Sequence, residues 1–237
     1  MVRNHRSHAG FTLDFFTAQD ELMKSLPDVQ KPGIAIFDMD STLIQMESID
    51  AIAAAAGHGE EVARVTEQAM QGELDFTEAL QQRVKLLKGV KESLIWDMAD
   101  NLPYSEGADE LLRFFKKHRW RIAIVSGGFT WFADTASMRF GADYVACNVL
   151  EVQNGMLTGR LLGSIVDAQA KADALEALMR QYGIPREQTI AVGDGANDIP
   201  MLKAAGLGVA YNAKPILREV ADVSIEDSLA GLIDILS

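Results

Sequence analysis

Short apolar runs that alternate with helical segments constrain the fold of this chain more than any other feature. The apolar runs cover residues 34–38, 122–126, 144–149, 189–194, 207–211 and 222–225. Helices are expected after Thr130, over residues 171–182 and near Ile199. Near-continuous apolar strands alternating with helices are typical of a buried parallel sheet with helices on both faces. The sequence therefore predicts an α/β fold with a doubly wound, Rossmann-like parallel sheet, and Asn154-Gly155 predicts one added hairpin.

The stretch between the first two strands has helical rather than strand spacing. Glycines at 57, 59 and 72 are expected to interrupt the helical pattern of residues 48–100, and Pro103 to end it. Asp75, followed three residues later by Glu78, predicts a capping box. The helix that it starts would carry Phe76 and Arg83 on one face, about two turns apart.

These patterns divide the chain into three parts. We expect an N-terminal segment (1–33), an α/β core (34–47 and 105–237) and an inserted helical cap domain (48–104). Residues 11–26 form an amphipathic stretch that we expect to pack on the core, with a partner-binding arm as the alternative. Ser105 is predicted to cap a helix over residues 108–118.

Composition excludes several classes of partner. The chain has 237 residues, 48% of them hydrophobic, and a formal net charge of −12. An acidic protein repels duplex nucleic acid and anionic membranes, so neither is an expected partner. No apolar stretch approaches the roughly 18 residues that span a bilayer, and Cys147 is the single cysteine. We therefore expect a cytoplasmic protein, monomeric or homodimeric, that acts on a small molecule.

Two carboxylates lie directly after the first apolar run. Asp38 and Asp40 are two residues apart, so in an extended chain they emerge on the same side. Like charges held together raise each other's pKa unless a cation relieves them, which indicates a metal. Two further apolar runs end in polar, glycine-rich stretches, at Ser126-Gly127-Gly128 and at Asp194-Gly195. In open α/β sheets ligands bind beyond the carboxyl ends of the strands, where these groups would meet.

The motifs DMDST (38–42), VSGG (125–128), Lys171 and GDGAND (193–198) together resemble those of the haloacid dehalogenase superfamily of phosphohydrolases. Within it the chain is most similar to the phosphoserine phosphatases, from Ile34 to the C-terminus. The resemblance implies that Asp38 is the nucleophile, which forms an aspartyl phosphate. It implies that Asp40 is the general acid and base, and that Mg²⁺ is held by Asp38, Asp194 and the backbone carbonyl of Asp40.

The same resemblance assigns the phosphate-binding and substrate-binding groups. It implies phosphate binding by Ser126, Gly127 and Lys171, with Asp198 positioning Lys171. The residues that it implies for substrate recognition are Glu47, Met70, Phe76, Arg83 and Asn197. Arg83 offers a planar fork for a carboxylate, and Glu47 an acceptor for an ammonium group. The implied reaction is hydrolysis of O-phosphoserine, the last step of serine biosynthesis.

Simpler interpretations of these residues remain open at this point. Asp38 could be a metal ligand only, Asp40 and Asp198 could be helix caps, and Ser126-Gly127-Gly128 could be an ordinary turn after a strand. The function could instead be that of a phosphatase or phosphotransferase for another small phosphorylated amino acid, for example with a homoserine acceptor. A catalytically silent sensor of small molecules is a third possibility.

Overall fold

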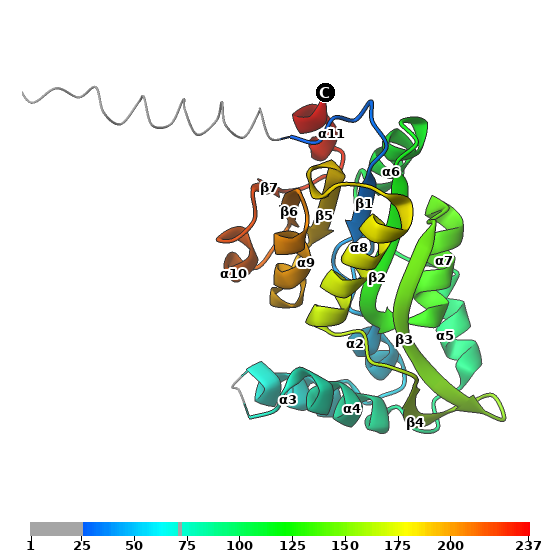
Figure 1. Ribbon diagram of the computed structural model, residues 1–237. Coiled ribbons are helices and arrows are strands. Elements are labelled where there is room, and N and C mark those ends of the chain that lie inside the picture. The colour runs from blue at the N-terminus through cyan, green and yellow to red at the C-terminus, as the bar shows by residue number, and fades with distance from the viewer. Residues whose placement is uncertain (1–25, 71–72) are drawn as a thin grey trace, which may run out of the picture.

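One seven-stranded sheet forms the centre of the molecule, in the order β4-β3-β2-β1-β5-β6-β7 (Figure 1). The computed structural model describes residues 26–70 and 73–237 of the chain, except the side chain of Met70. The strands are β1 (Ile34–Phe37), β2 (Arg121–Phe129), β3 (Tyr144–Gln153), β4 (Met156–Leu162), β5 (Thr189–Gly193), β6 (Leu207–Tyr211) and β7 (Val223–Ile225).

All neighbouring strands run parallel except β4, which pairs antiparallel with β3. The β3–β4 turn is the predicted hairpin, with φ of 53° at Asn154 and 74° at Gly155, the left-handed conformation that these two residue types accommodate. From β1 the chain first builds one half of the sheet and then returns to build the other half on the far side of β1. The doubly wound α/β fold is thus confirmed, and its reversal point lies at β1.

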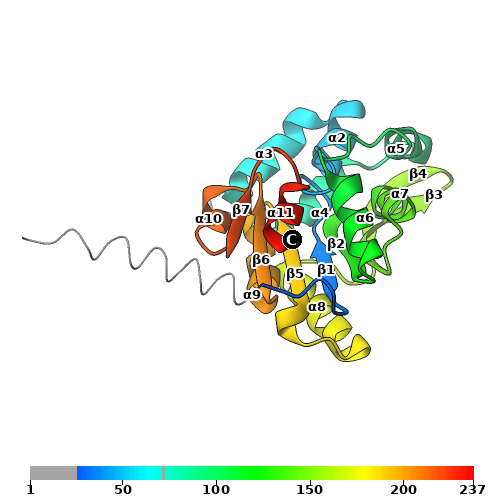
Figure 2. The same ribbon diagram turned by 90° about the horizontal axis from the view of Figure 1, so that it is seen from above.

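Two hydrophobic layers cover the two faces of the sheet, and β1 contributes alternately to both. Ile34 and Ile36 belong to the layer beneath α8 (Ala168–Tyr182), α9 (Ile199–Ala204) and α10 (Pro215–Arg218). Ala35 and Phe37 belong to the layer beneath α6 (Ala108–Lys117), α7 (Thr130–Phe140) and α11 (Gly231–Leu236). The two views show this sandwich of helices, sheet and helices (Figure 2). Among the described residues, no helix is both long and apolar enough to cross a membrane.

In the described part of the segment between β1 and α6 lie four helices: α2 (Ser48–Ala55), α3 (Gly59–Met70), α4 (Phe76–Leu86) and α5 (Glu92–Ala99). The helices α3 and α4 lie beyond one end of the sheet (Figure 1). The predicted capping box is present: the backbone N–H of Glu78 donates to Asp75 Oδ1 (2.8 Å), and that of Asp75 donates to Glu78 Oε2 (3.2 Å).

Several predicted boundaries are wrong. The predicted break near Gly57 is present between α2 and α3, with φ of 80° at Gly57, but Gly59 is already the first residue of α3. An unpredicted break follows α4, where Gly89 has φ of 88°. Helix α8 begins three residues earlier than predicted, because Asp167 accepts a hydrogen bond from the N–H of Ala170 as its N-cap. Ser105 does not cap α6, whose N-cap is Gly107. The amphipathic stretch 11–26 lies outside the described residues except for its last member.

The capping box should help to hold α4 in place. Replacing Asp75 by Ala leaves the N–H of Glu78 without its acceptor and should lower the free energy of unfolding by about 0.5–2 kcal/mol. Asn accepts the same hydrogen bond, so Asp75→Asn is the matched control, and its free energy of unfolding should stay near that of the parent protein. Chemical denaturation of the three proteins measures this. Equal stability of the Ala and Asn variants would contradict the account.

Candidate active site

A cavity opens where the carboxyl ends of β1, β2 and β5 face the helices α2 and α4. Its lining residues are Asp38, Asp40, Glu47, Ser48, Ile49, Phe76, Leu80, Arg83, Ser126, Gly127, Gly128, Asp194, Asn197 and Lys214. The structure therefore brings most of the sequence-predicted residues together around one space. Lys171 and Asp198 lie buried beside it, 1% and 0% exposed. Met70 ends α3, and its side chain is outside the described part of the chain.

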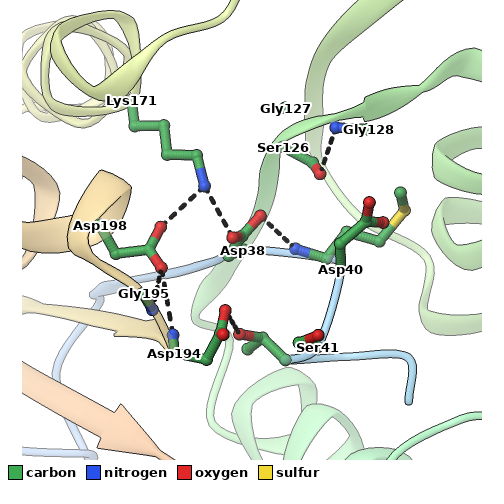
Figure 3. Close-up of polar contacts among 12 residues, drawn as sticks. Asp38, Asp40, Ser41, Ser126, Gly127, Gly128, Lys171, Asp194, Gly195 and Asp198 are labelled. Atoms are coloured by element: carbon green, nitrogen blue, oxygen red, sulfur yellow. Dashed lines mark hydrogen bonds and ion pairs between the residues drawn. The ribbon is translucent and has the colours of Figure 1, made fainter. Parts of the chain in front are cut away.

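Lys171 joins the strand ends at this site. Its Nζ lies 2.8 Å from Asp38 Oδ2 and 2.7 Å from Asp198 Oδ1 (Figure 3). The second oxygen of Asp198 accepts hydrogen bonds from the N–H groups of Asp194 and Gly195, each 3.1 Å long. Asp198 occupies the N-cap position of α9, but its side chain makes no capping bond there. Its carboxylate instead fixes Lys171 and the loop after β5.

The site buries an excess of negative charge, because the carboxylates of Asp38, Asp194 and Asp198 lie close together beside Lys171. Burial lowers the pKa of Lys171, but Asp38 and Asp198 more than offset this, so its pKa lies above the usual value and it stays charged. Burial, then the charge of Asp198, raises the pKa of Asp38 well above its usual range, against the opposing effect of Lys171. The same two causes raise the pKa of Asp194 to about 6. An additional cation would relieve this excess of negative charge.

The donor set suits Mg²⁺, which prefers oxygen ligands and commonly takes one or two carboxylates. Carboxylate oxygens of Asp38, Asp194 and Asp198 lie within 4.8 Å of one another. Both oxygens of Asp198 are already occupied by Lys171 and by two backbone N–H groups. The carboxylate of Asp194 makes only one long hydrogen-bond contact with the described residues, 3.5 Å from the Thr42 hydroxyl. Asp38 accepts one bond at each oxygen, from the Met39 N–H (2.7 Å) and from Lys171, whereas Asp198 accepts three. Since an ionised carboxylate offers about four acceptor sites, Asp194 and then Asp38 keep the most capacity for a metal ion, and the Asp40 side chain lies outside this cluster.

Asp40 is held through one oxygen only. Its Oδ2 accepts hydrogen bonds from the N–H (2.9 Å) and the hydroxyl (2.6 Å) of Ser48, the first residue of α2. Its Oδ1 is buried and has no hydrogen-bond partner among the described residues. Burial raises the pKa of Asp40 to about 7, against the two bonds from Ser48. The alternative of a helix cap thus describes Oδ2, while Oδ1 has no partner among the described residues and belongs to a residue that lines the cavity.

The Ser126-Gly127-Gly128 segment is part of β2, not the turn that the sequence suggested. The strand continues to Phe129, and its pairing with β3 shifts register between Val125 and Phe129. Within this irregularity the N–H of Gly128 donates to Ser126 Oγ at 2.9 Å (Figure 3). The bulge keeps these residues at the cavity wall instead of in a regular ladder.

The helices α2 and α4 provide the opposite wall. Arg83 is half-buried, and burial lowers its pKa, with Asp50 and Glu47 opposing this. No carboxylate of the described residues lies within ion-pair distance of its guanidinium group; the nearest polar contact is Nε to the Ala79 carbonyl, a long 3.4 Å. Glu47 Oε1 accepts a hydrogen bond from the Ser41 hydroxyl at 2.7 Å. A cation and an anion therefore face the cavity without pairing with each other.

Two polar residues of the cavity, Ser48 and Lys214, escaped the sequence interpretation. Ser48 lies eight residues after Asp40, and nothing in their spacing indicates the contact between them. Lys214 follows β6 and lines the cavity, and its backbone N–H donates to the Asp194 carbonyl at 2.9 Å. The rule that ligands bind beyond strand ends could have identified Lys214, because it follows the predicted strand 207–211.

Comparison with known proteins agrees with this architecture. The family model for haloacid dehalogenase-like hydrolases matches residues 35–203. The phosphoserine phosphatase of Vibrio cholerae is 47% identical over 226 residues, which are 95% of this chain and 67% of that protein. The phosphoserine phosphatase of Idiomarina loihiensis is 48% identical over 204 residues, covering 86% of this chain and 92% of that protein.

A solved structure described as a phospho-aspartyl intermediate analogue of phosphoserine phosphatase superposes with a TM-score of 0.81. It is 40% identical and covers 87% of this chain and 100% of its own. The chain therefore belongs to the haloacid dehalogenase-like hydrolases and, within them, to the family of the phosphoserine phosphatases.

The two glycines of β2 should respond differently to alanine. A Cβ at Gly128 would lie 2.9 Å from both Asp40 Oδ1 and Ser48 Oγ, whereas one at Gly127 meets nothing closer than 3.6 Å. Gly128→Ala should lower the free energy of unfolding by about 1–3 kcal/mol through overpacking. Gly127→Ala is the matched control and should change it by less than about 0.5 kcal/mol. Urea unfolding compares them, and equal losses in both variants would contradict the described packing.

Proposed function

We propose that this chain hydrolyses O-phosphoserine to serine and phosphate, the last step of serine biosynthesis, with Asp38 as the nucleophile. The observation that carries the proposal is the Lys171 bridge, which holds the Asp38 carboxylate at a cavity whose far wall carries Glu47 and Arg83. The relatives named phosphoserine phosphatases, at 47% and 48% identity, support the same reaction.

In the first step the Asp38 carboxylate attacks phosphorus, and the bond between phosphorus and the serine oxygen breaks. The leaving alkoxide takes a proton from Asp40 Oδ1. In the second step a water attacks the phosphorus of the aspartyl phosphate and gives its proton back to Asp40, which frees Asp38 and phosphate. A positioned acid and base of this kind typically contributes ~10²–10⁴ in rate. The free Oδ1 of Asp40 is the structural support for this role.

Ser126, Gly127 and Lys171 are the proposed phosphate-binding groups. The Ser126 hydroxyl and the Gly127 backbone N–H can donate to phosphate oxygens. Lys171 supplies a fixed positive charge that stabilises the phosphoryl group during transfer. The proposed protein ligands of Mg²⁺ are the carboxylates of Asp38 and Asp194 and the backbone carbonyl of Asp40. When bound, the ion offsets the repulsion between the phosphate and the site's carboxylates.

Substrate recognition is proposed to belong to the helices before α6. Arg83 would bind the carboxylate of phosphoserine, Glu47 its ammonium group, and Phe76 would cover the bound substrate, with Asn197 contacting it from the core. Met70 is proposed for the same group from the sequence alone. On this account residues 48–104 act as a helical cap domain on a phosphatase core of residues 34–47 and 105–237. The support is that α2 and α4 contribute Ser48, Phe76 and Arg83 to the cavity.

Phosphate release from a panel of phosphomonoesters tests the proposal. O-phosphoserine should have the highest kcat/KM, above O-phosphothreonine, O-phosphohomoserine, phosphoethanolamine and p-nitrophenyl phosphate, and chelation by EDTA should abolish turnover. Asp38→Asn should also abolish it, whereas Asp234→Asn, an exposed change on α11, should not. Equal activity on phosphoethanolamine, which lacks the carboxylate, would contradict the substrate assignment. Near-normal activity of Asp38→Asn would contradict the mechanism.

Arg83→Ala should mainly raise KM for phosphoserine. It removes a charge-assisted pair worth about 1.5–3 kcal/mol, so kcat/KM should fall roughly 10- to 150-fold. The kinetics of p-nitrophenyl phosphate, which has no carboxylate, should change little. Arg64→Ala removes an exposed arginine of α3 that does not line the cavity, and it serves as the matched control. Unchanged phosphoserine kinetics in the Arg83 variant would remove both the carboxylate assignment and the role of the helical cap in recognition.

A further inference from the structure

Asn148, on β3, has a buried side chain whose two ends are both bonded to backbone groups near the cavity. It is 1% exposed. Its Nδ2 donates to the carbonyl of Gly127 at 2.8 Å, and its Oδ1 accepts from the N–H of Val166 at 2.9 Å. The orientation of the amide is unambiguous, because a carbonyl can only accept and a backbone N–H can only donate.

The register shift in the sheet explains why Gly127 needs a partner from a side chain. Val125 pairs with Ala146 and Phe129 pairs with Asn148, so residues 126–128 of β2 lie opposite Cys147 alone. Three residues against one cannot all find ladder partners. Within this irregular stretch the Asn148 side chain donates to the Gly127 carbonyl.

The bond from Asn148 to the Gly127 carbonyl fixes the orientation of the Gly127-Gly128 peptide, and this peptide in turn contacts Ser126. The Gly127 carbonyl and the Gly128 N–H belong to the same planar peptide unit. Asn148 holds the carbonyl, and the N–H points to Ser126 Oγ, 2.9 Å away (Figure 3). Because Oγ accepts this bond, its own proton is free to point toward the cavity. A peptide between two glycines has little intrinsic resistance to rotation, so this orientation depends on the bond from Asn148.

The other end of the amide reaches the segment that leads to Lys171. Val166 directly precedes Asp167, the N-cap of α8, and Lys171 lies in the first turns of that helix. The Val166 carbonyl also lies 3.9 Å from the position that a Cβ of Gly127 would occupy. One side chain thus connects the two segments that carry the proposed phosphate-binding groups.

We propose that Asn148 is a positioning residue for the phosphate group: its side-chain amide sets the Gly127-Gly128 peptide so that Ser126 donates to phosphate. This inference rests on the proposed phosphatase function and adds a residue that has no contact with the substrate. The proposal predicts that a change at Asn148 weakens one part of ligand binding and not the other. Phosphate binding should weaken when the amide is changed, whereas binding of the amino-acid part, near Glu47 and Arg83, should not.

Asn148→Asp is the sharpest variant. An aspartate has almost the same shape and can still accept from Val166, but its carboxylate turns an oxygen toward the Gly127 carbonyl and removes the donor. Asn148→Ala, which removes both bonds, is the second variant. Thr189→Val is the matched control. The Thr189 side chain is also buried and bridges two backbone groups, donating to the Arg186 carbonyl (2.7 Å) and accepting from the Gly206 N–H (2.8 Å). It lies at the start of β5, at the opposite end of the sheet from the cavity.

The measurement is the inhibition constant of inorganic phosphate and, separately, of L-serine, with Mg²⁺ present, together with kcat and KM for phosphoserine. Both Asn148 variants should weaken phosphate inhibition at least tenfold and lower kcat, and leave serine inhibition within twofold of the parent value. Thr189→Val should lower the melting temperature about as much as the Asn148 variants do, and it should leave both inhibition constants within twofold of the parent values.

Equal weakening of phosphate and serine inhibition, or Asn148 variants no different from Thr189→Val, would overturn the proposal. If Asn148→Ala does not fold, Asn148→Asp decides the question. Direct calorimetric titration of inorganic phosphate into each protein needs no turnover. A parent protein that binds phosphate but does not hydrolyse phosphoserine would therefore contradict the proposed function, and the Asn148 comparison would still stand.

Discussion

The buried ammonium group of Lys171, held between Asp38 and Asp198, is the interaction on which the rest of the site depends. A charged lysine that is 1% exposed is tolerable only with close counter-charges, here at 2.8 and 2.7 Å. These contacts join α8, the end of β1 and the loop after β5, which are far apart in the sequence. Removing either carboxylate would leave part of the lysine's charge unpaired. The geometry of Asp38 is therefore fixed by distant segments through Lys171 as well as by its own loop, where the Met39 N–H donates to Asp38 Oδ1 at 2.7 Å.

In the proposed function, two walls of one cavity carry two separate tasks. The strand ends carry the carboxylates and the β2 bulge, which suit phosphate chemistry and a metal ion. The facing helices carry Arg83 and Phe76, which are the residues proposed to distinguish one phosphate ester from another. Asp40 connects the walls, because it lines the cavity after β1 and one of its oxygens accepts two bonds from Ser48 at the start of α2. Its other oxygen has no partner among the described residues. An enzyme built this way can change its substrate by changing the helices while it keeps its chemistry.

Much of the fold was predictable because it follows from local patterns. Apolar runs alternating with helices define the parallel sheet, Asn154-Gly155 defines the hairpin, and Asp75 with Glu78 defines the start of α4. The motif residues after three strands were also expected to meet, since strand ends share one edge of the sheet.

What the sequence could not reveal are contacts between distant segments. The continuation of β2 through Gly127 depends on a bulge stabilised by Asn148 from the neighbouring strand, so the local pattern predicted a turn. The bonds from Ser48 to Asp40 and the position of Lys214 likewise arise only once the chain is folded. Gly59 shows a different limit, because the same residue can interrupt a helix or begin one.

Chemical trapping of the phosphorylated carboxylate tests the central claim most directly. Enzyme quenched in acid during turnover of phosphoserine is treated with tritiated borohydride, which reduces an aspartyl phosphate to homoserine, and the labelled peptide is then sequenced. The account predicts label at position 38 and none in the Asp38→Asn variant. Label at another carboxylate, or rapid turnover without any labelled homoserine, would contradict it.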